Sequence, residues 1–93
     1  TFSKVITINV WKMQNKWEQN PSKLVKKFQF KDFEEALKFI NSVGQIAESM
    51  NHHPKIVNLY NTVTIELWTH NQNAVTDLDF QLAEEIDRRM GSN

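Results

Sequence analysis

The three histidines of the chain are the residues best suited to acid–base chemistry. His52 and His53 follow a long amphipathic segment, and His70 ends a later β-like segment. Because the charge of an imidazole changes between about pH 5 and 8, such groups can supply both a proton donor and a proton acceptor near neutrality. Glu48 lies one helical turn before His52, where its carboxylate could orient an imidazole. The alternative is a polar loop at His52 and His53 with an unrelated His70.

Asp79 is a second candidate, because its carboxylate falls within the apolar stripe of the last expected helix. One interpretation is a helix cap, in which Asp79 returns a hydrogen bond to Thr76, three residues earlier. The other is that Asp79 faces a histidine under the rim of the sheet. The sequence alone leaves both interpretations open.

A metal site is a weaker interpretation of the same residues. The chain has no cysteine and no His-x-x-x-His pair, which are frequent sources of zinc ligands. The residue before Pro54 favours extended backbone, so the adjacent side chains of His52 and His53 should point apart rather than chelate one ion. We therefore expect no metal.

The composition restricts the other classes of function. A chain of 93 residues is expected to form a single domain over 1–93. Eleven basic and eleven acidic residues give a formal net charge of zero, which disfavours direct nucleic-acid binding. The absence of cysteine fits a cytoplasmic or nuclear protein. There is no apolar run of membrane-spanning length and no secretory signal in the first ten residues, so we expect a soluble chain.

Two β-hairpins are expected to carry part of this chemistry. The first joins residues 16–18 to residues 23–30 through the turn cluster Asn20-Pro21-Ser22. The second joins residues 56–60 to residues 63–69 around Asn61-Thr62, where asparagine tolerates a positive φ. Residues 1–10 are β-branched and favour a strand, although a short helix could begin after them.

Two helices complete the expected fold. Asp32, with Glu35 three residues later, predicts the start of a helix that ends near Asn51, ahead of Pro54. Its expected apolar face consists of Phe33, Leu37, Ile40, Val43, Gly44, Ala47 and Met50. Thr76 is expected to cap a last helix, whose apolar side consists of Leu78, Leu82, Ala83, Ile86 and Met90. Helices that cover one face of an antiparallel sheet give an α+β domain.

The order of these residues resembles that of the pterin-4a-carbinolamine dehydratases. The resemblance rests on the run Glu48-Ser49-Met50-Asn51-His52-His53-Pro54, then Tyr60, Thr69-His70 and Asp79-Phe80-Gln81-Leu82-Ala83, and it extends from about Trp17 to Ile86. It implies a four-stranded antiparallel sheet with two to three helices packed on one face. The opening helix usual in the family is not evident in residues 1–10, and the glycine common after the Thr-His pair is missing from residues 71–74.

The resemblance also implies an activity and a set of roles. The family reaction removes water from 4a-hydroxytetrahydrobiopterin to give quinonoid dihydrobiopterin, during the recycling of tetrahydrobiopterin. The pterin is the substrate, so no cofactor is implied. By resemblance His52 and His70 are the general acid and base in an unassigned order, His53 holds or polarises the pterin, and Glu48 and Asp79 tune the imidazoles.

Further contacts and partners follow from the same resemblance. The residues expected to contact the pterin besides the histidines are Asn51, Trp68, Thr69 and Asn71, with Trp17 closing the pocket. Family members form homo-oligomers, here a homodimer or homotetramer, and some serve as dimerisation cofactors of a homeodomain transcription factor. Phe39, Ile46 and Phe80 lie away from the main apolar stripes. They could contact a transcription-factor partner, but the favoured interpretation is that they pack in a homo-oligomer or widen the buried face of their helices.

Overall fold

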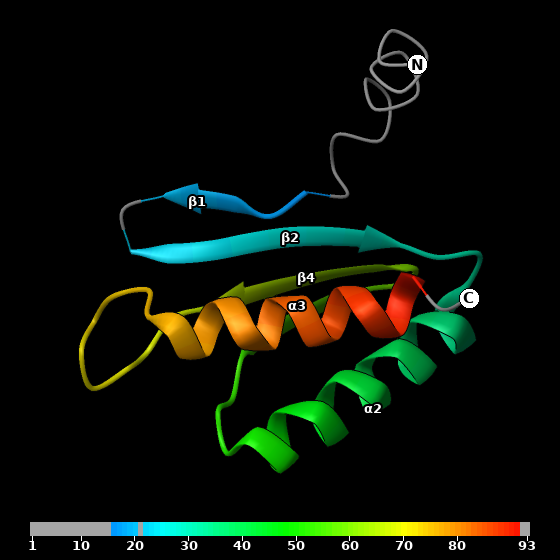
Figure 1. Cartoon of the computed structure of the whole chain (residues 1–93). Coiled ribbons are helices and arrows are strands. Elements are labelled where there is room, and N and C mark those ends of the chain that lie inside the picture. Colours follow the sequence, from blue (N-terminus) through cyan, green and yellow to red (C-terminus); the bar gives the residue numbers. More distant parts are fainter. Residues whose placement is uncertain (1–15, 21, 92–93) are drawn as a thin grey trace, which may run out of the picture.

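The computed structural model of the chain describes residues 16–20 and 22–91, so the expectations for residues 1–10 and for Pro21 lie outside it. The described part contains four strands and two helices (Figure 1). In chain order they are β1, Glu18–Asn20; β2, Lys23–Gln29; α2, Phe33–Met50; β3, Lys55–Leu59; β4, Thr62–Leu67; and α3, Asp77–Gly91.

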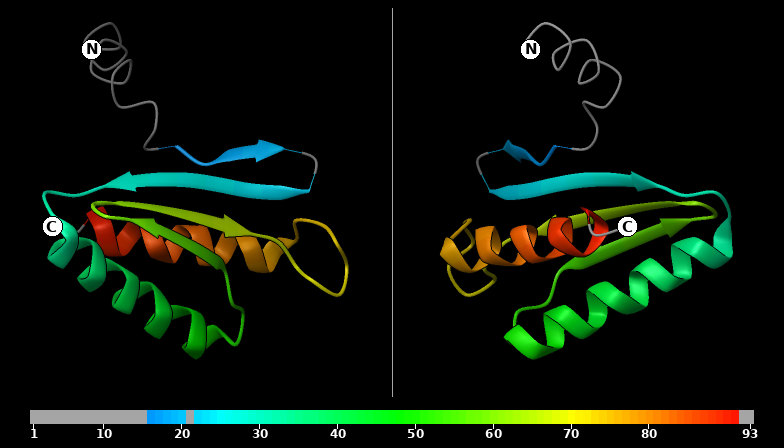
Figure 2. Two further views of the ribbon diagram at one scale, coloured as in Figure 1. Left: turned by 180° about the vertical axis from the view of Figure 1, so that it is seen from behind. Right: turned by 45° about the vertical axis from the view of Figure 1, so that its right-hand side comes forward.

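The four strands form one antiparallel sheet in the order β1-β2-β4-β3, so that β2 and β4 are central and β1 and β3 are edges. Helices α2 and α3 lie on the same face of this sheet, as the views in Figure 2 show. The predicted α+β class, with a four-stranded antiparallel sheet and helices on one face, is therefore confirmed.

The turn between β3 and β4 differs from the prediction by one residue. Leu59 pairs with Thr62, so the loop consists of Tyr60 and Asn61, and Tyr60 rather than Asn61 has the positive φ, of 53°. Asn61 instead bonds to Phe30: its side-chain amide donates to the Phe30 carbonyl at 2.8 Å, and its own carbonyl accepts from the Phe30 N–H at 2.8 Å. These two bonds tie the hairpin to the end of β2.

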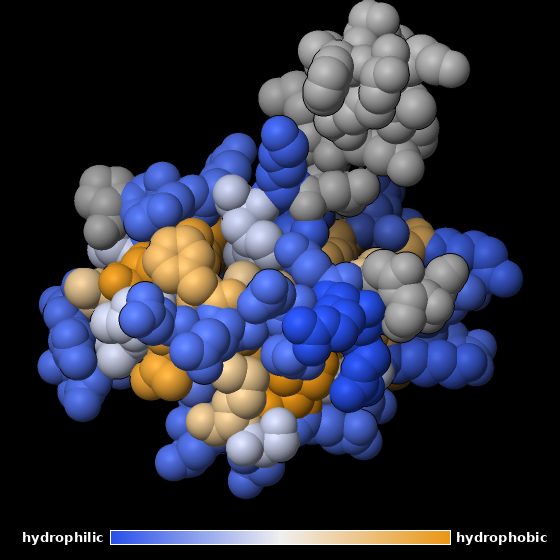
Figure 3. All heavy atoms as spheres, viewed as in Figure 1, coloured by the Kyte–Doolittle hydropathy of each residue, from blue (hydrophilic) through white to orange (hydrophobic). Residues whose placement is uncertain are grey.

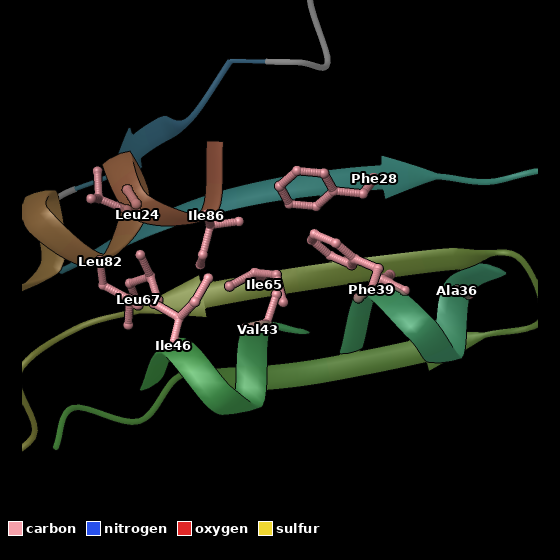
Figure 4. Packing of buried hydrophobic residues seen from close by; sticks show 12 residues of the cluster. Leu24, Phe28, Ala36, Phe39, Val43, Ile46, Ile65, Leu67, Leu82 and Ile86 are labelled. Atoms are coloured by element: carbon pink, nitrogen blue, oxygen red, sulfur yellow. The ribbon is translucent and has the colours of Figure 1, made fainter. Parts of the chain in front are cut away.

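The core lies between the sheet and the two helices (Figure 4). The alternation predicted for β4 is confirmed, because Val63, Ile65 and Leu67 are fully buried. The Phe28 ring of β2 packs on the Phe39 ring of α2, with centroids 4.6 Å apart. Burial of this apolar surface supplies the main stabilisation of a small domain.

The prediction for the buried face of α2 was partly wrong. Phe39 and Ile46, expected off the main stripe, are each only 6% exposed, whereas Phe33 and Leu37 are 43% and 41% exposed. The full buried set of α2 is Ala36, Phe39, Val43, Ile46 and Ala47. Apolar residues occupy both flanks of this helix, so periodicity alone could not decide which flank turns inward. Phe39 and Ile46 are therefore core residues and cannot serve as a docking surface.

Candidate active site

The three histidines meet where the end of α2, the end of β4 and the start of α3 converge. They line a concavity of about 400 Å³. Its complete lining is Asn51, His52, His53, Thr69, His70, Asn71 and Leu78. Two other hollows, of about 440 and 510 Å³, lie beside α2 and α3 and contain no histidine, so the chemistry points to the first.

The end of α2 aims His52 into this concavity. Asn51 takes the left-handed conformation with φ 52°, and its N–H bonds back to the carbonyls of Ala47 and Glu48. Left-handed backbone at this position is a common way for a helix to end, and asparagine tolerates it. The His52 N–H also donates to the Ala47 carbonyl, at 3.1 Å. The helix therefore ends where predicted, and the chain turns sharply at the histidine pair.

His52 is anchored from behind by Asp79. The distance from His52 Nε2 to Asp79 Oδ1 is 2.6 Å, and the Asp79 side chain is fully buried while 11% of His52 remains exposed. Asp79 Oδ2 accepts from the Thr76 N–H at 2.9 Å and from the Thr69 hydroxyl at 2.9 Å. Both interpretations of Asp79 thus hold at once: the carboxylate bonds to the cap residue and faces a histidine.

His53 turns to a different carboxylate. Its Nε2 lies 2.9 Å from Glu48 Oε1, and both side chains are largely solvent-exposed. Glu48 therefore contacts His53 rather than His52, although His52 is the residue one helical turn away. The two adjacent imidazoles have separate partners, in keeping with the prediction that they point apart.

His70 completes the concavity from the loop after β4. This loop closes on Thr69, whose N–H donates to the Ala74 carbonyl at 2.8 Å and whose carbonyl accepts from the Asn73 N–H at 2.8 Å. The ring of Trp68 lies 4.7 Å from the ring of His70, centroid to centroid, at an angle of 37°. Trp68, expected as a pterin contact, thus flanks His70 without lining the concavity itself.

Trp17 is not brought to this site. Its indole Nε1 donates to Asp87 Oδ2 at 3.0 Å. Its ring packs edge-to-face with that of Phe28, with centroids 6.1 Å apart. Lys26 Nζ bonds to the other oxygen of Asp87, at 2.7 Å. These contacts engage Trp17 between β2 and the later turns of α3, so in this structure it does not close the concavity.

Two residues at the site were missed by sequence reasoning. Leu78 lines the concavity and is 43% exposed, although it was assigned to the buried side of α3. Thr76 was assigned only a capping role, yet its hydroxyl lies 2.6 Å from that of Thr69. On the face shown in Figure 3, apolar side chains gather over the N-terminal end of α3, the turn that contains Leu78 and the half-exposed Phe80.

The site has the parts for proton transfer. In residues 16–20 and 22–91, no three histidine or carboxylate side chains converge in a way that could hold a metal ion. No helix in the same part of the chain is long and apolar enough to cross a membrane. What the concavity does hold is one largely buried, carboxylate-anchored imidazole and two more exposed ones, which suits general acid–base chemistry on a small molecule.

Comparison with known proteins identifies the fold and the family. The family model of pterin 4 alpha carbinolamine dehydratase matches residues 4–89. Relatives from Synechococcus sp. and Sulfurisphaera tokodaii, both provisionally named pterin-4-alpha-carbinolamine dehydratase, are 48% and 46% identical over 71 residues, which is 76% of this chain and 76% of each relative.

Solved structures agree. A transcriptional coactivator/pterin dehydratase from Brucella melitensis is 31% identical, with a TM-score of 0.75 over 88% of this chain and 89% of that one. A pterin dehydratase-like RuBisCO assembly factor of the alpha-carboxysome is 20% identical, with a TM-score of 0.64 over 78% and 84%, and shares the fold. Together with the family match, these similarities show that the chain belongs to the pterin-4-alpha-carbinolamine dehydratase family.

Proposed function

We propose that this protein is a dehydratase that removes water from 4a-hydroxytetrahydrobiopterin to give quinonoid dihydrobiopterin, in the recycling of tetrahydrobiopterin. The observation that carries the proposal is the placement of His52 and His70 in one concavity of about 400 Å³, with buried Asp79 behind His52. Family membership supplies the substrate class.

The proposed reaction needs one acid and one base. The bond from C4a to the hydroxyl oxygen breaks, and a proton from the acid turns that oxygen into water. The base removes the proton from N5, whose electron pair forms the new N5–C4a double bond. No electron leaves the pterin, so the reaction as written requires no redox cofactor and no metal. His52 and His70 are the proposed acid–base pair.

The remaining lining residues would hold the pterin. His53, with its exposed edge toward solvent, is proposed to bind or polarise the ring, and Asn51 and Asn71 offer amide groups at the rim. Leu78 offers an apolar surface to a flat ring. Thr69 contributes backbone, because its hydroxyl is turned inward to Asp79.

The test is the decay of freshly generated 4a-hydroxytetrahydropterin, followed by stopped-flow ultraviolet absorbance. Wild-type protein should accelerate the decay, and His52→Ala and His70→Ala should each reduce that acceleration by about 10²- to 10⁴-fold, the range typical of one general acid or base. Lys31→Ala, an exposed substitution away from the concavity, is the matched control. A folded wild-type protein without any acceleration would refute the proposal.

A second proposed function is partner binding as a dimerisation cofactor of a transcription factor, or self-association as a homodimer or homotetramer. The specific observation is the outer face of α2, where Phe33 and Leu37 are exposed and a side chain at Gly44 would meet nothing within 4 Å. A helix-interior glycine costs about 1 kcal/mol relative to alanine, and no contact within the described chain requires one here. The missing side chain at Gly44 would let another molecule approach the backbone of α2 closely. The coactivator named among the structural relatives fits this role, and a cytoplasmic or nuclear location stays a prediction.

Single substitutions should distinguish the two proposed functions. Leu37→Glu should weaken assembly, measured by sedimentation, and leave the histidine concavity intact. His52→Ala should abolish dehydration and leave assembly unchanged. A monomeric wild-type protein that binds no partner would remove the second proposal and leave the first standing.

A further inference from the structure

Asp79 is surrounded by more hydrogen-bond donors than a helix cap requires. Its two oxygens receive contacts from His52 Nε2, the Thr69 hydroxyl and the Thr76 N–H, at 2.6, 2.9 and 2.9 Å. The Thr69 hydroxyl also lies 2.6 Å from that of Thr76. Two hydroxyls, a carboxylate and an imidazole therefore form one continuous chain under the floor of the concavity.

The proton positions along this chain follow from counting donors. A carboxylate can only accept, so the Thr69 hydroxyl must give its one proton to Asp79 Oδ2. The Thr69 oxygen is then free only to accept, and the Thr76 hydroxyl must donate to it. Every bond in the chain points the same way, from Thr76 through Thr69 to Asp79.

The same count of donors and acceptors fixes the tautomer of the His52 imidazole. Asp79 Oδ1 accepts from His52, so a neutral His52 carries its proton on Nε2 and leaves Nδ1 as a lone-pair acceptor. In residues 16–20 and 22–91 no group forms a hydrogen bond to Nδ1, and no side-chain nitrogen there is both buried and unpaired. Within this part of the chain Nδ1 is therefore open to solvent, and His52 lines the concavity.

We propose that Thr69 and Thr76 are a pair of positioning residues that hold Asp79 as an acceptor toward His52, and thereby set His52 as the base of the site through Nδ1. The role of His52 as a base rests on the proposed dehydratase function, whereas the positioning of Asp79 rests on the hydrogen bonds alone. Once Nδ1 has taken a proton, Asp79 stabilises the resulting imidazolium. His70 then remains as the acid.

Thr69 is also placed to link base and acid. Its backbone closes the loop that carries His70, through the bonds to Ala74 and Asn73, while its hydroxyl supports Asp79. Thr76 stands at the start of α3, where its carbonyl accepts from the Asp79 N–H at 3.0 Å. The hydroxyl chain therefore connects the His70 loop to the helix that holds the partner of His52.

The test compares Thr69→Val, Thr76→Val, Thr76→Ala and Thr76→Ser with Thr64→Val, a matched threonine on the open face of β4. The first readout is the tautomer of neutral His52, from ring ¹⁵N shifts of the free protein. We expect the Nε2–H form in wild type and in Thr76→Ser. The ratio of the Nε2–H to the Nδ1–H tautomer should fall about 10-fold in Thr69→Val and about 3-fold in Thr76→Val, because a carboxylate that has lost a positioning bond on Oδ2 can turn away from His52 Nε2, and such a bond to a charged group is worth about this much. Thr76→Ala repeats the measurement if valine disturbs folding.

The second readout compares the change in kcat with the change in KM. kcat should fall by the same factors, with KM changed by less than about 2-fold, because neither hydroxyl faces the concavity. If Thr69→Val and both apolar Thr76 variants match Thr64→Val in tautomer and in kcat, the proposal is wrong. If the tautomer shifts but wild-type protein has no dehydratase activity, the hydroxyl chain is supported and the proposed function fails.

Discussion

Two carboxylate–imidazole pairs flank the same concavity, and they differ in burial far more than in length. His52 and Asp79 lie 2.6 Å apart with side chains 11% and 0% exposed. His53 and Glu48 lie 2.9 Å apart with side chains 56% and 81% exposed. The pairs use the same chemical groups and come from adjacent histidines.

The difference separates a fixed group from an adaptable one. Around Asp79 the low dielectric strengthens each hydrogen bond, and Thr69 and Thr76 occupy its second oxygen. Around Glu48, water competes for both partners, and exposed ion pairs contribute about 0 to 1 kcal/mol. We infer that proton transfer belongs to the buried pair and that substrate recognition belongs to the exposed one.

The strongest way to break this comparison is Asp79→Asn. The asparagine carbonyl can still accept from Thr69 and Thr76, so its amide would face His52 Nε2 and impose the opposite tautomer. We expect kcat to fall by about 10² to 10⁴, the loss typical of a general base held in the wrong tautomer. The free energy of unfolding should fall by about 1 to 3 kcal/mol in urea titrations, because a buried charge-assisted bond is lost.

Asp77→Asn is the matched control, since it removes a carboxylate from the same first turn of α3 at an exposed position. It should leave kcat within about 2-fold of wild type. Equal losses in the two variants would mean that charge at the helix start, rather than the bond to His52, accounts for the effect.

A third ion pair, between Lys26 and Asp87, tests whether burial of an ion pair is by itself enough to affect kcat. Lys26 is 7% exposed and lies 2.7 Å from Asp87, which is 41% exposed and also accepts from Trp17. Asp87→Asn should lower the free energy of unfolding by about 1 to 2 kcal/mol, because the buried ammonium loses its charged partner while the half-exposed site admits water. Glu84→Gln, exposed on the same helix, is the control in urea unfolding. A change in kcat beyond about 2-fold would contradict the assignment of this cluster to stability.

Much of this arrangement could be predicted from the sequence, because the signals were local. The strand alternation at Val63, Ile65 and Leu67 and the end of α2 at Asn51 depend on neighbouring residues, and both are as expected. Asp79 stood out because a carboxylate in an apolar stripe needs a partner. Its contact with His52 spans 27 positions, and the family resemblance brought the two residues together more readily than periodicity did.

The errors arose where tertiary packing decides between local alternatives. Phe39 and Phe33 are both apolar residues of α2, and it is tertiary contact with the rings of Phe28 and Phe30 that places Phe39 in the core. Trp17 was expected at the concavity from the family resemblance, yet it bonds to the carboxylate of Asp87, 70 positions later in the sequence, and lies elsewhere. The Thr76 hydroxyl had no sequence signal beyond capping, because its partner Thr69 is met only in the folded chain.

A smaller effect should follow from His53→Ala, which removes the exposed imidazole. If His53 recognises the pterin, KM should rise by about 3- to 10-fold, as expected for one lost hydrogen bond, while kcat stays within about 2-fold of wild type. Steady-state kinetics over a range of pterin concentrations makes this measurement, and His53→Gln should restore part of the loss by offering an amide. A fall in kcat comparable to that of His52→Ala would assign proton transfer to His53 as well.

The smallest effect should come from Glu48→Gln. The carboxylate is 81% exposed, and among the described residues its side-chain partner is an exposed imidazole. Its loss should therefore change the free energy of unfolding by less than about 0.5 kcal/mol and kcat/KM by less than about 2-fold. A double-mutant cycle of Glu48→Gln with His53→Ala isolates the pair, and the coupling energy should also lie below about 0.5 kcal/mol. A coupling above about 1 kcal/mol would mean that the exposed pair is ordered far more firmly than its solvent contact implies. The contrast with the buried pair would then rest on hydrogen-bond geometry, because burial would no longer distinguish a fixed imidazole from an adaptable one.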